Sequence, residues 1–310
     1  MPWSSELRGD RAIISLPRKC RTPLIFSTDE FAVAGDHLQP DLQSAALFVQ
    51  HSADDASVHS LAGGAVAVFS ARSPDKETAN EDAAAIIPTG PRSGILAVAD
   101  GMGGLPAGEQ ASQLAIEHLL RSITESLKTP EPNTRAAILD GIEAANRAVS
   151  EIGVGAATTL AVVEIQDDTL RPYHVGDSMI LLVGQRGKIK LQTVSHSPVG
   201  YAVEAGFLDE AEAMYHDERH FVSNMIGSTD MHITIGSTLK LGRHDTILLA
   251  SDGLLDNLHT EEIVERIRKG PLPRTTADMA AEARRRMSDP TAGNPSKPDD
   301  LTFIAFRRTG

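Results

Sequence analysis

The chain has 310 residues, of which 41% are hydrophobic and 23% are charged, and its formal net charge is −13. A chain of this length can bury a core of good size in one large domain or two small ones. The acidic balance argues against nucleic acid and anionic membranes as partners. It is compatible with a site that is built from carboxylates and neutralised by cations.

Cys20 is the single cysteine, so no intrachain disulfide can form, which is typical of proteins in a reducing compartment. The first nine residues lack the apolar core of a signal peptide. No apolar run approaches the roughly 20 residues that a membrane helix needs. We therefore expect a cytoplasmic protein with no membrane contact. The sequence does not indicate an oligomeric state.

Residues 1–62 show no strong periodicity and are interpreted as an N-terminal extension of unknown role, followed by a patterned domain over residues 63–310. Apolar runs predict strands at residues 65–69 and 95–99. Two helices are expected at about residues 108–128 and 134–152, because apolar residues recur there at the spacing of one helix face.

Short strands are predicted next, at residues 158–165, 170–175, 179–183 and 188–193. The turn-like links between them indicate antiparallel neighbours. Residues 195–230 have no clear period. A strand at 246–250, helices at 260–268 and 275–287, and a strand at 301–307 complete the chain. Because strands and helices are segregated, we predict an α+β fold with antiparallel sheets.

Acidic residues flank several of the predicted strands. They are Glu81 and Asp82, Asp100, Asp177, Asp252 with Asp256, and Asp299 with Asp300. Strand ends converge at the rim of a sheet, so these acids can meet in space. Several carboxylates together cannot all stay ionised without compensation. All-oxygen ligands favour Mg²⁺ or Mn²⁺ over zinc as the compensating ion.

Taken singly, each of these acids has an ordinary structural explanation. An Asp-Gly pair such as Asp100-Gly101 is typical of a turn, and Asp256 is a residue favoured near the start of a helix. The order of the set along the chain is more informative than any one member.

This order resembles the PPM (type 2C) protein phosphatases, and most closely their bacterial branch. The resemblance covers residues 63–307 and rests on Asn80-Glu81-Asp82, Asp100-Gly101-Met102-Gly103-Gly104, Ala157-Thr158-Thr159, Gly176-Asp177-Ser178, Ser251-Asp252-Gly253 with Asp256, and Asp299-Asp300-Leu301-Thr302. It implies a four-layer α/β/β/α sandwich of two antiparallel sheets flanked by helices, with a flap region at about residues 195–230.

The resemblance also implies a metal site with two Mn²⁺ or Mg²⁺ ions. Their expected ligands are Glu81, Asp82, Asp100, the carbonyl of Gly101, Asp252 and Asp299. Asp100 would bridge the two ions. Asp177, Asp252 and Asp256 match positions that hold a weaker third ion in some members.

The implied activity is the hydrolysis of phosphoserine and phosphothreonine in proteins by a metal-activated water, with no protein nucleophile. Phosphorylated proteins would be the partners. Two other readings stay open at this point. The chain could be a catalytically silent scaffold that binds phosphoproteins, or a related hydrolase of small phosphate esters.

One position departs from the family pattern. Family members commonly carry a phosphate-binding arginine shortly before the Asn-Glu-Asp stretch, and here the matching position is Glu77. A carboxylate cannot bind phosphate in this way. Arg72 or Lys76 is therefore the candidate for that role.

Overall fold

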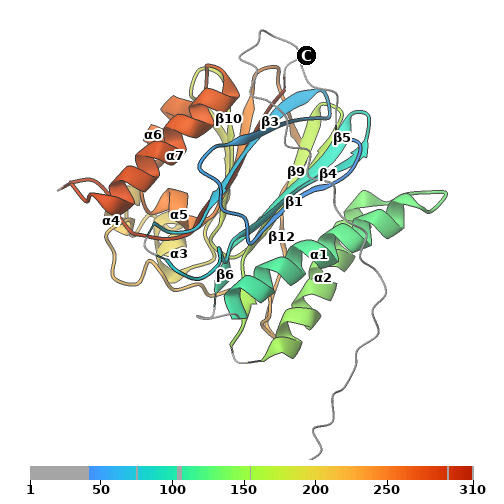
Figure 1. Ribbon diagram of the computed structural model, residues 1–310, viewed down its shortest axis with the longest axis horizontal. Helices are drawn as coiled ribbons and strands as arrows, with labels where there is room; N and C mark the ends of the chain where they lie inside the picture. Colours follow the sequence, from blue (N-terminus) through green and yellow to red (C-terminus); the bar gives the residue numbers. More distant parts are fainter. Residues whose placement is uncertain (1–41, 75, 103–106, 154, 292, 309–310) are drawn as a thin grey trace, which may run out of the picture. The chain divides into compact units, whose positions relative to one another are not determined.

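The computed structural model describes residues 42–308 except 75, 103–106, 154 and 292 (Figure 1). Cys20, Gly103, Gly104 and the extension up to residue 41 therefore lie outside the described residues. In the part that is described, two antiparallel sheets and two groups of helices are built around the core.

The first sheet has the strand order β1-β4-β5-β8-β9-β12, and β13 also pairs with β9. Its strands are β1 (Ala46–Val49), β4 (Ala83–Gly90), β5 (Ser93–Ala99), β8 (Leu160–Gln166), β9 (Thr169–Val175), β12 (Thr234–Ile235) and β13 (Leu239–Lys240). Neighbouring strands run antiparallel throughout.

The second sheet has the order β11-β10-β14-β15-β3-β2 and is also antiparallel. Its strands are β2 (Ser57–Leu61), β3 (Gly64–Ala71), β10 (Met179–Val183), β11 (Ile189–Gln192), β14 (Thr246–Ala250) and β15 (Leu301–Arg308). A separate short pair joins β6 (Gly101–Met102) to β7 (Ala157–Thr158).

The side chains of the central strands alternate between two buried surfaces, as the pleat of a strand requires. On β5, Leu96 and Val98 belong to the cluster between the sheets, whereas Ala97 and Ala99 belong to the cluster under the first pair of helices. On β3, Val66 and Val68 belong to the cluster between the sheets, whereas Ala67 and Phe69 belong to the cluster under the second group of helices. The strands are therefore apolar on both faces.

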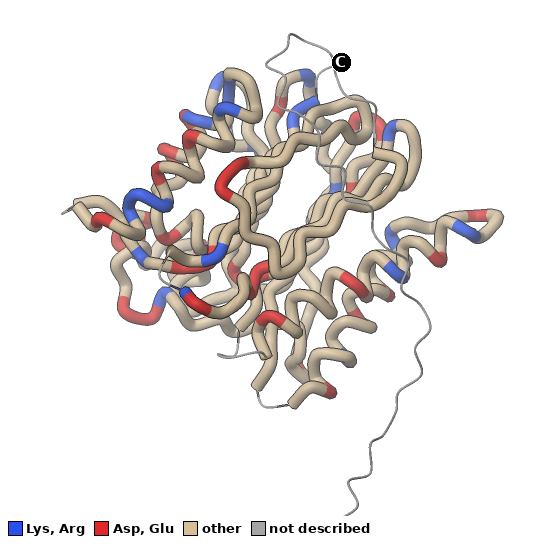
Figure 2. The backbone as a smooth tube through the Cα atoms, viewed as in Figure 1, with Lys and Arg blue, Asp and Glu red and all other residues tan. Residues whose placement is uncertain are grey.

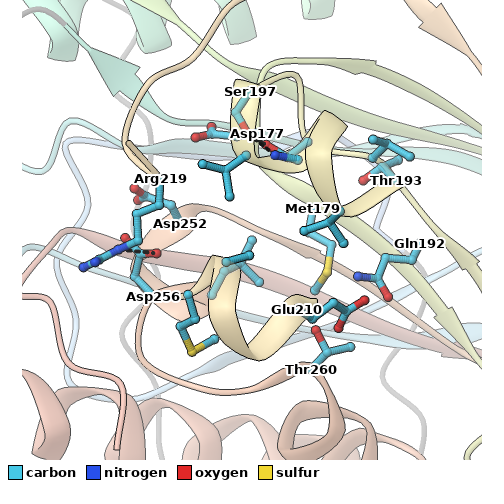
Figure 3. Close-up of a pocket in the computed structure, with 18 of the residues that line it drawn as sticks. Asp177, Met179, Gln192, Thr193, Ser197, Glu210, Arg219, Asp252, Asp256 and Thr260 are labelled. Atoms are coloured by element: carbon cyan, nitrogen blue, oxygen red, sulfur yellow. Dashed lines mark hydrogen bonds and ion pairs between the residues drawn. The ribbon is translucent and has the colours of Figure 1, made fainter. Parts of the chain in front are cut away.

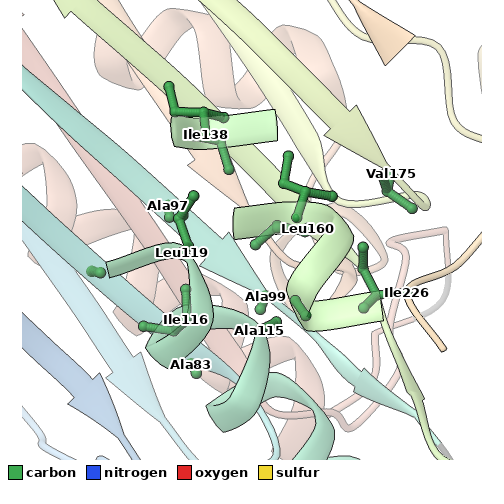
Figure 4. Packing of buried hydrophobic residues seen from close by; sticks show 14 of the residues in the cluster. Ala83, Ala97, Ala99, Ala115, Ile116, Leu119, Ile138, Leu160, Val175 and Ile226 are labelled. Atoms are coloured by element: carbon green, nitrogen blue, oxygen red, sulfur yellow. The ribbon is translucent and has the colours of Figure 1, made fainter. Parts of the chain in front are cut away.

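Helices α1 (Ala107–Leu127) and α2 (Thr134–Ile152) cover the outer face of the first sheet (Figures 1 and 4). Helices α5 (Asp252–Leu255), α6 (Thr260–Ile267) and α7 (Leu272–Ser288) cover the second. This arrangement confirms the predicted four-layer sandwich. Charged residues of both signs are interspersed along the outer helices (Figure 2).

Local sequence explains how α1 and α2 pack so closely. Asn133 caps α2, because its Oδ1 accepts a hydrogen bond from the N–H of Ala136 at 3.0 Å. Gly141 faces α1 at a point where a Cβ would lie 3.0 Å from the Cα of Leu119. A glycine is therefore needed here for the close approach of the two helices.

Several expectations need correction. The sheets begin before residue 63, because β1 pairs with β4 and β2 pairs with β3. Strand β4 was not predicted at all, and α7 begins at Leu272 and not at residue 275. The flap region contains two short helices, α3 (Pro198–Glu204) and α4 (Glu210–Ala213).

Among the described helices, none combines the length and apolar character needed to cross a bilayer.

The buried face of α1 should contribute strongly to stability. Leu119 is fully buried, whereas Leu127 at the end of the same helix is 37% exposed. We expect Leu119→Ala to lower the free energy of unfolding by about 2–5 kcal/mol, because it leaves a cavity in a packed core. The matched Leu127→Ala should cost less than about 1 kcal/mol. Urea denaturation measures both, and equal losses would contradict this packing.

Candidate metal centre

The acids that were singled out in the sequence meet at one end of the sandwich. Asp82 directly precedes β4, Asp100 follows β5, and Asp177 lies two residues after β9. Asp252 begins α5 just after β14, and Asp299 lies two residues before β15. Adjacent antiparallel strands place these ends at the same rim. We call Asp82, Asp100, Asp177, Asp252, Asp256 and Asp299 the carboxylate cluster.

Burial and mutual repulsion perturb these carboxyl groups. Burial, followed by the charge of Asp252, raises the pKa of Asp100 well above its usual range. Burial and the charge of Asp300 do the same to the pKa of Asp82, and burial and Asp252 raise the pKa of Asp177 to about 7. So many carboxylates cannot all be ionised unless cations lie among them.

Buried hydroxyl groups hold Asp82 in place. Its Oδ2 accepts a hydrogen bond from the Oγ of Ser251 at 2.8 Å, and its backbone N–H donates to Asn80 at 2.9 Å. Ser251 is bonded in turn to the backbone of Thr302 on β15. These contacts explain why Asn80, Ser251 and Thr302 occur in the motifs.

The threonines before β8 hold the backbone of Asp100. The hydroxyl of Thr158 donates to the carbonyl of Asp100 at 2.8 Å. The N–H of Asp100 donates to the Oγ1 of Thr159 at 3.1 Å, and that oxygen is 2.6 Å from the Oγ of Ser178. One chain of contacts thus joins the loop of Asp100 to the loop of Asp177.

Two glycines allow Glu81 to approach Gly101. A Cβ on Gly108 would lie 2.9 Å from the Oε1 of Glu81 and 3.0 Å from the carbonyl oxygen of Gly101. A Cβ on Gly101 would collide with the carbonyl of Gly108 at 2.2 Å. The side chain of Glu81 and the carbonyl of Gly101 therefore both lie close to Gly108.

His196 of the flap region supports the turn that carries Asp177. The Nδ1 of its ring accepts a hydrogen bond from the N–H of Gly176 at 3.1 Å, and its backbone N–H donates to the carbonyl of Gly176 at 2.9 Å. Gly176 has a φ of 106°, a conformation that favours glycine. His196 is buried, and burial lowers its pKa to about 4, so it is neutral at physiological pH.

Lys297 is the residue of this site that sequence reasoning missed. Its Nζ lies 2.8 Å from Asp252, 2.9 Å from Asp256 and 3.0 Å from Asp299. Burial favours the neutral amine, but these carboxylates outweigh it and raise the pKa of Lys297. The sequence signal that could have identified it is its position two residues before Asp299, one of the acids of the motif.

The carboxylates are therefore arranged around an ammonium group. Within the described residues, no three or more Asp, Glu, His and Cys side chains are arranged as they stand to hold a metal ion.

The two candidates for phosphate binding differ in position. Lys76 donates to the Oε2 of Glu81 at 2.7 Å and to the Oδ2 of Asp300 at 2.5 Å. Arg72 is exposed, and its backbone N–H donates to the Oγ of Ser52 at 3.2 Å. Among the described contacts, Lys76 and not Arg72 reaches Glu81, one of the expected metal ligands. Asp300 is buried and also accepts hydrogen bonds from the backbone N–H groups of Ser73 and Glu81. It therefore fixes both ends of the loop between β3 and β4.

A pocket of ≈ 400 Å³ opens beside the carboxylate cluster. Asp177, Asp252 and Asp256 contribute to its wall, and the flap region supplies Val199, Met214 and Arg219. Figure 3 shows Asp252, Asp256 and Arg219 at one side and Gln192 and Thr193 at the other. The pocket is thus partly apolar and borders three members of the carboxylate cluster.

Comparison with known proteins agrees with this geometry. The Protein phosphatase 2C family profile matches residues 71–288. Protein phosphatase PhpP of Streptococcus pneumoniae is 32% identical over 175 residues, which cover 54% of this chain and 70% of PhpP. Serine/threonine protein phosphatase PstP of Mycobacterium tuberculosis is 31% identical over 217 residues, which cover 68% of this chain and 39% of PstP.

Solved structures of serine/threonine phosphatases superpose on this chain. The serine/threonine phosphatase of S. agalactiae superposes with a TM-score of 0.66 at 27% identity, covering 78% of this chain and 98% of that one. The catalytic domain of PstP in complex with two manganese ions superposes with a TM-score of 0.61 at 26% identity, covering 78% and 96%. The chain belongs to the protein phosphatase 2C family, in its bacterial branch.

Proposed function

We propose that the carboxylate cluster is the metal centre of a metal-dependent phosphatase that hydrolyses phosphoserine and phosphothreonine in proteins. The observation that carries the proposal is the convergence of acids from five separate segments beside an open pocket. The family and its serine/threonine phosphatases support the activity.

The proposed ligands of two Mn²⁺ or Mg²⁺ ions are Asp82, Asp100, Asp252, Asp299, Glu81 and the carbonyl of Gly101. This donor set fits hard divalent cations, because every donor is an oxygen and most are carboxylates. The raised pKa values of Asp82, Asp100 and Asp299 point the same way, since each marks a carboxyl whose ionisation needs positive charge nearby. The two manganese ions in the related PstP catalytic domain support the number of ions.

When bound, the pair of ions supplies a water of lowered pKa and positive charge for the phosphoryl oxygens. The protein itself supplies the positions. Ser251 and Thr159 fix the carboxylate of Asp82 and the backbone of Asp100 through hydrogen bonds. The pocket beside Asp252 has room for the residues that flank a phosphorylated side chain.

Some finer features remain proposals. A third, weaker ion would use Asp177, Asp252 and Asp256, and two of these contact Lys297. We propose a cytoplasmic location because the sequence has one cysteine. The net charge of −13 favours neither nucleic acid nor an anionic membrane as a partner.

The activity can be tested with p-nitrophenyl phosphate and a phosphothreonine peptide, each with Mn²⁺ and with a chelator. We expect Mn²⁺-dependent turnover of both. Asp252→Asn should lower kcat/KM by more than about 100-fold, because bound ions provide several kcal/mol of transition-state stabilisation. Asp168→Asn, in the exposed turn before β9, is the matched control. Turnover of neither substrate would indicate a scaffold, and turnover of the small ester alone would indicate a small-ester hydrolase.

The replacement for the missing arginine can be tested by kinetics at saturating Mn²⁺. We propose Lys76 for this role because it lies beside Glu81. Lys76→Ala should raise KM for the peptide by roughly tenfold with little change in kcat, as expected for one charge-assisted hydrogen bond of about 1.5 kcal/mol. Arg72→Ala should leave both constants unchanged. A rise in KM for Arg72→Ala alone would transfer the role to Arg72.

The stability of the metal-free protein should depend on pH. The folded-state pKa values of Asp82, Asp100 and Asp177 are raised, the last to about 7, so the folded state holds more protons than the unfolded chain. The Tm in chelator should therefore fall as pH rises from about 5.5 to about 8. Mn²⁺ should restore it, and more strongly at the higher pH, because metal and protons compete. A Mn²⁺ effect that is larger at the lower pH would contradict this.

A further inference from the structure

Lys297 contacts three members of the carboxylate cluster, one through a hydrogen bond and two as ion pairs. An ammonium group has three N–H donors and no acceptor. Its Nζ is within 3.0 Å of three different carboxylates, those of Asp252, Asp256 and Asp299. Only 27% of the side chain is exposed. The ammonium group of Lys297 is therefore surrounded by carboxylates on three sides, as a bound metal cation would be.

The backbone of Lys297 is fixed by a buried side chain. The N–H of Lys297 donates to the Oδ1 of Asn257 at 3.0 Å, and the Nδ2 of Asn257 donates to the carbonyl of Lys297 at 2.8 Å. Asn257 is fully buried and also donates to the carbonyl of Gly253. The loop of Lys297 is thus tied to the helix that begins with Asp252.

A second contact holds the same loop from the other side. The hydroxyl of Ser296 donates to the carbonyl of Arg286 at 2.7 Å. Arg286 is buried, donates to the carbonyl of Asn257 and pairs with Glu262. Lys297 is therefore held by hydrogen bonds of its loop as well as by the carboxylates.

Asp256 distinguishes this arrangement from a simple surface ion pair. Its Oδ2 faces Lys297 at 2.9 Å, and its Oδ1 faces the Nε of Arg219 at 3.7 Å. Both oxygens of Asp256 therefore already have a cationic partner. Asp252 contacts Lys297 through Oδ2. Asp252 and Asp299 are shared with the proposed pair of ions, whereas Asp256 belongs only to the third-ion set.

We propose that Lys297 is a built-in cation that takes the place of the third divalent ion. The protein then binds two ions per chain and not three. This inference rests on the proposed metal centre. The ammonium belongs to a loop that Asn257 holds in place, and it repels a divalent ion brought to the same carboxylates. Arg219 adds to this repulsion.

The number of bound ions tests the proposal without reference to turnover. Equilibrium dialysis against Mn²⁺, followed by elemental analysis, should give two ions per chain for the wild type and for Lys297→Arg. Lys297→Met keeps the length of the side chain but removes the charge, and should give three. Adding Asp256→Asn to Lys297→Met should return the number to two.

Lys190→Met is the matched control. Lys190 pairs with the buried carboxylate of Asp245 at 2.5 Å, away from the carboxylate cluster. Its loss should leave the number of ions at two. The Tm of the metal-free protein should also fall for Lys297→Met and rise again when Mn²⁺ is added.

Three results would overturn the proposal. A wild type that binds three ions would show that Lys297 does not exclude the third, and this result needs no variant to fold. A Lys297→Met protein that stays at two ions, with a raised KM, would assign Lys297 to phosphate binding. If the wild type binds one ion and Lys297→Met binds two, Lys297 excludes one of the proposed pair of ions and not the third. A wild type that binds two ions but hydrolyses neither substrate would reject the proposed function and leave this inference standing.

Discussion

The structure depends on one electrostatic constraint, which is the crowding of carboxylates at one end of a sandwich of two sheets. Asp82 is buried and Asp100 and Asp177 are partly buried among other acids, and desolvation and these neighbours raise the pKa of each. Carboxyl groups crowded in this way can all be ionised only when cations lie among them. Lys297 supplies one positive charge, and the proposed pair of divalent ions supplies the rest.

The fold supports this crowded end by covering the central strands of both sheets on both faces. Apolar side chains fill the space between the sheets and under the helices, and this packing fixes the strand ends that carry the acids. Buried hydroxyl and amide groups then orient the carboxylates, as Ser251 does for Asp82 and Thr159 for the backbone of Asp100. Because these groups lie at the ends of different strands, the site and the fold are stabilised together.

Sequence patterns predicted the parts of the fold whose signals are local. The helical periodicity of residues 134–152 gave α2 at the observed bounds. Strand β4 was missed because Ala83, Ala84 and Ala85 have weak strand propensity and Pro88 interrupts the run; pairing with β1 and β5 decides its conformation. The acids were found by motif, but Lys297 was not, because its contacts with Asp252 and Asp256 join distant segments.

The most direct test of the account is a crystal structure of the protein grown with Mn²⁺, with the ions located by anomalous diffraction. The account predicts two manganese ions among Asp82, Asp100, Asp252 and Asp299, with the ammonium of Lys297 still against Asp256. Carboxylates that point away from one another, with no manganese among them, would contradict it.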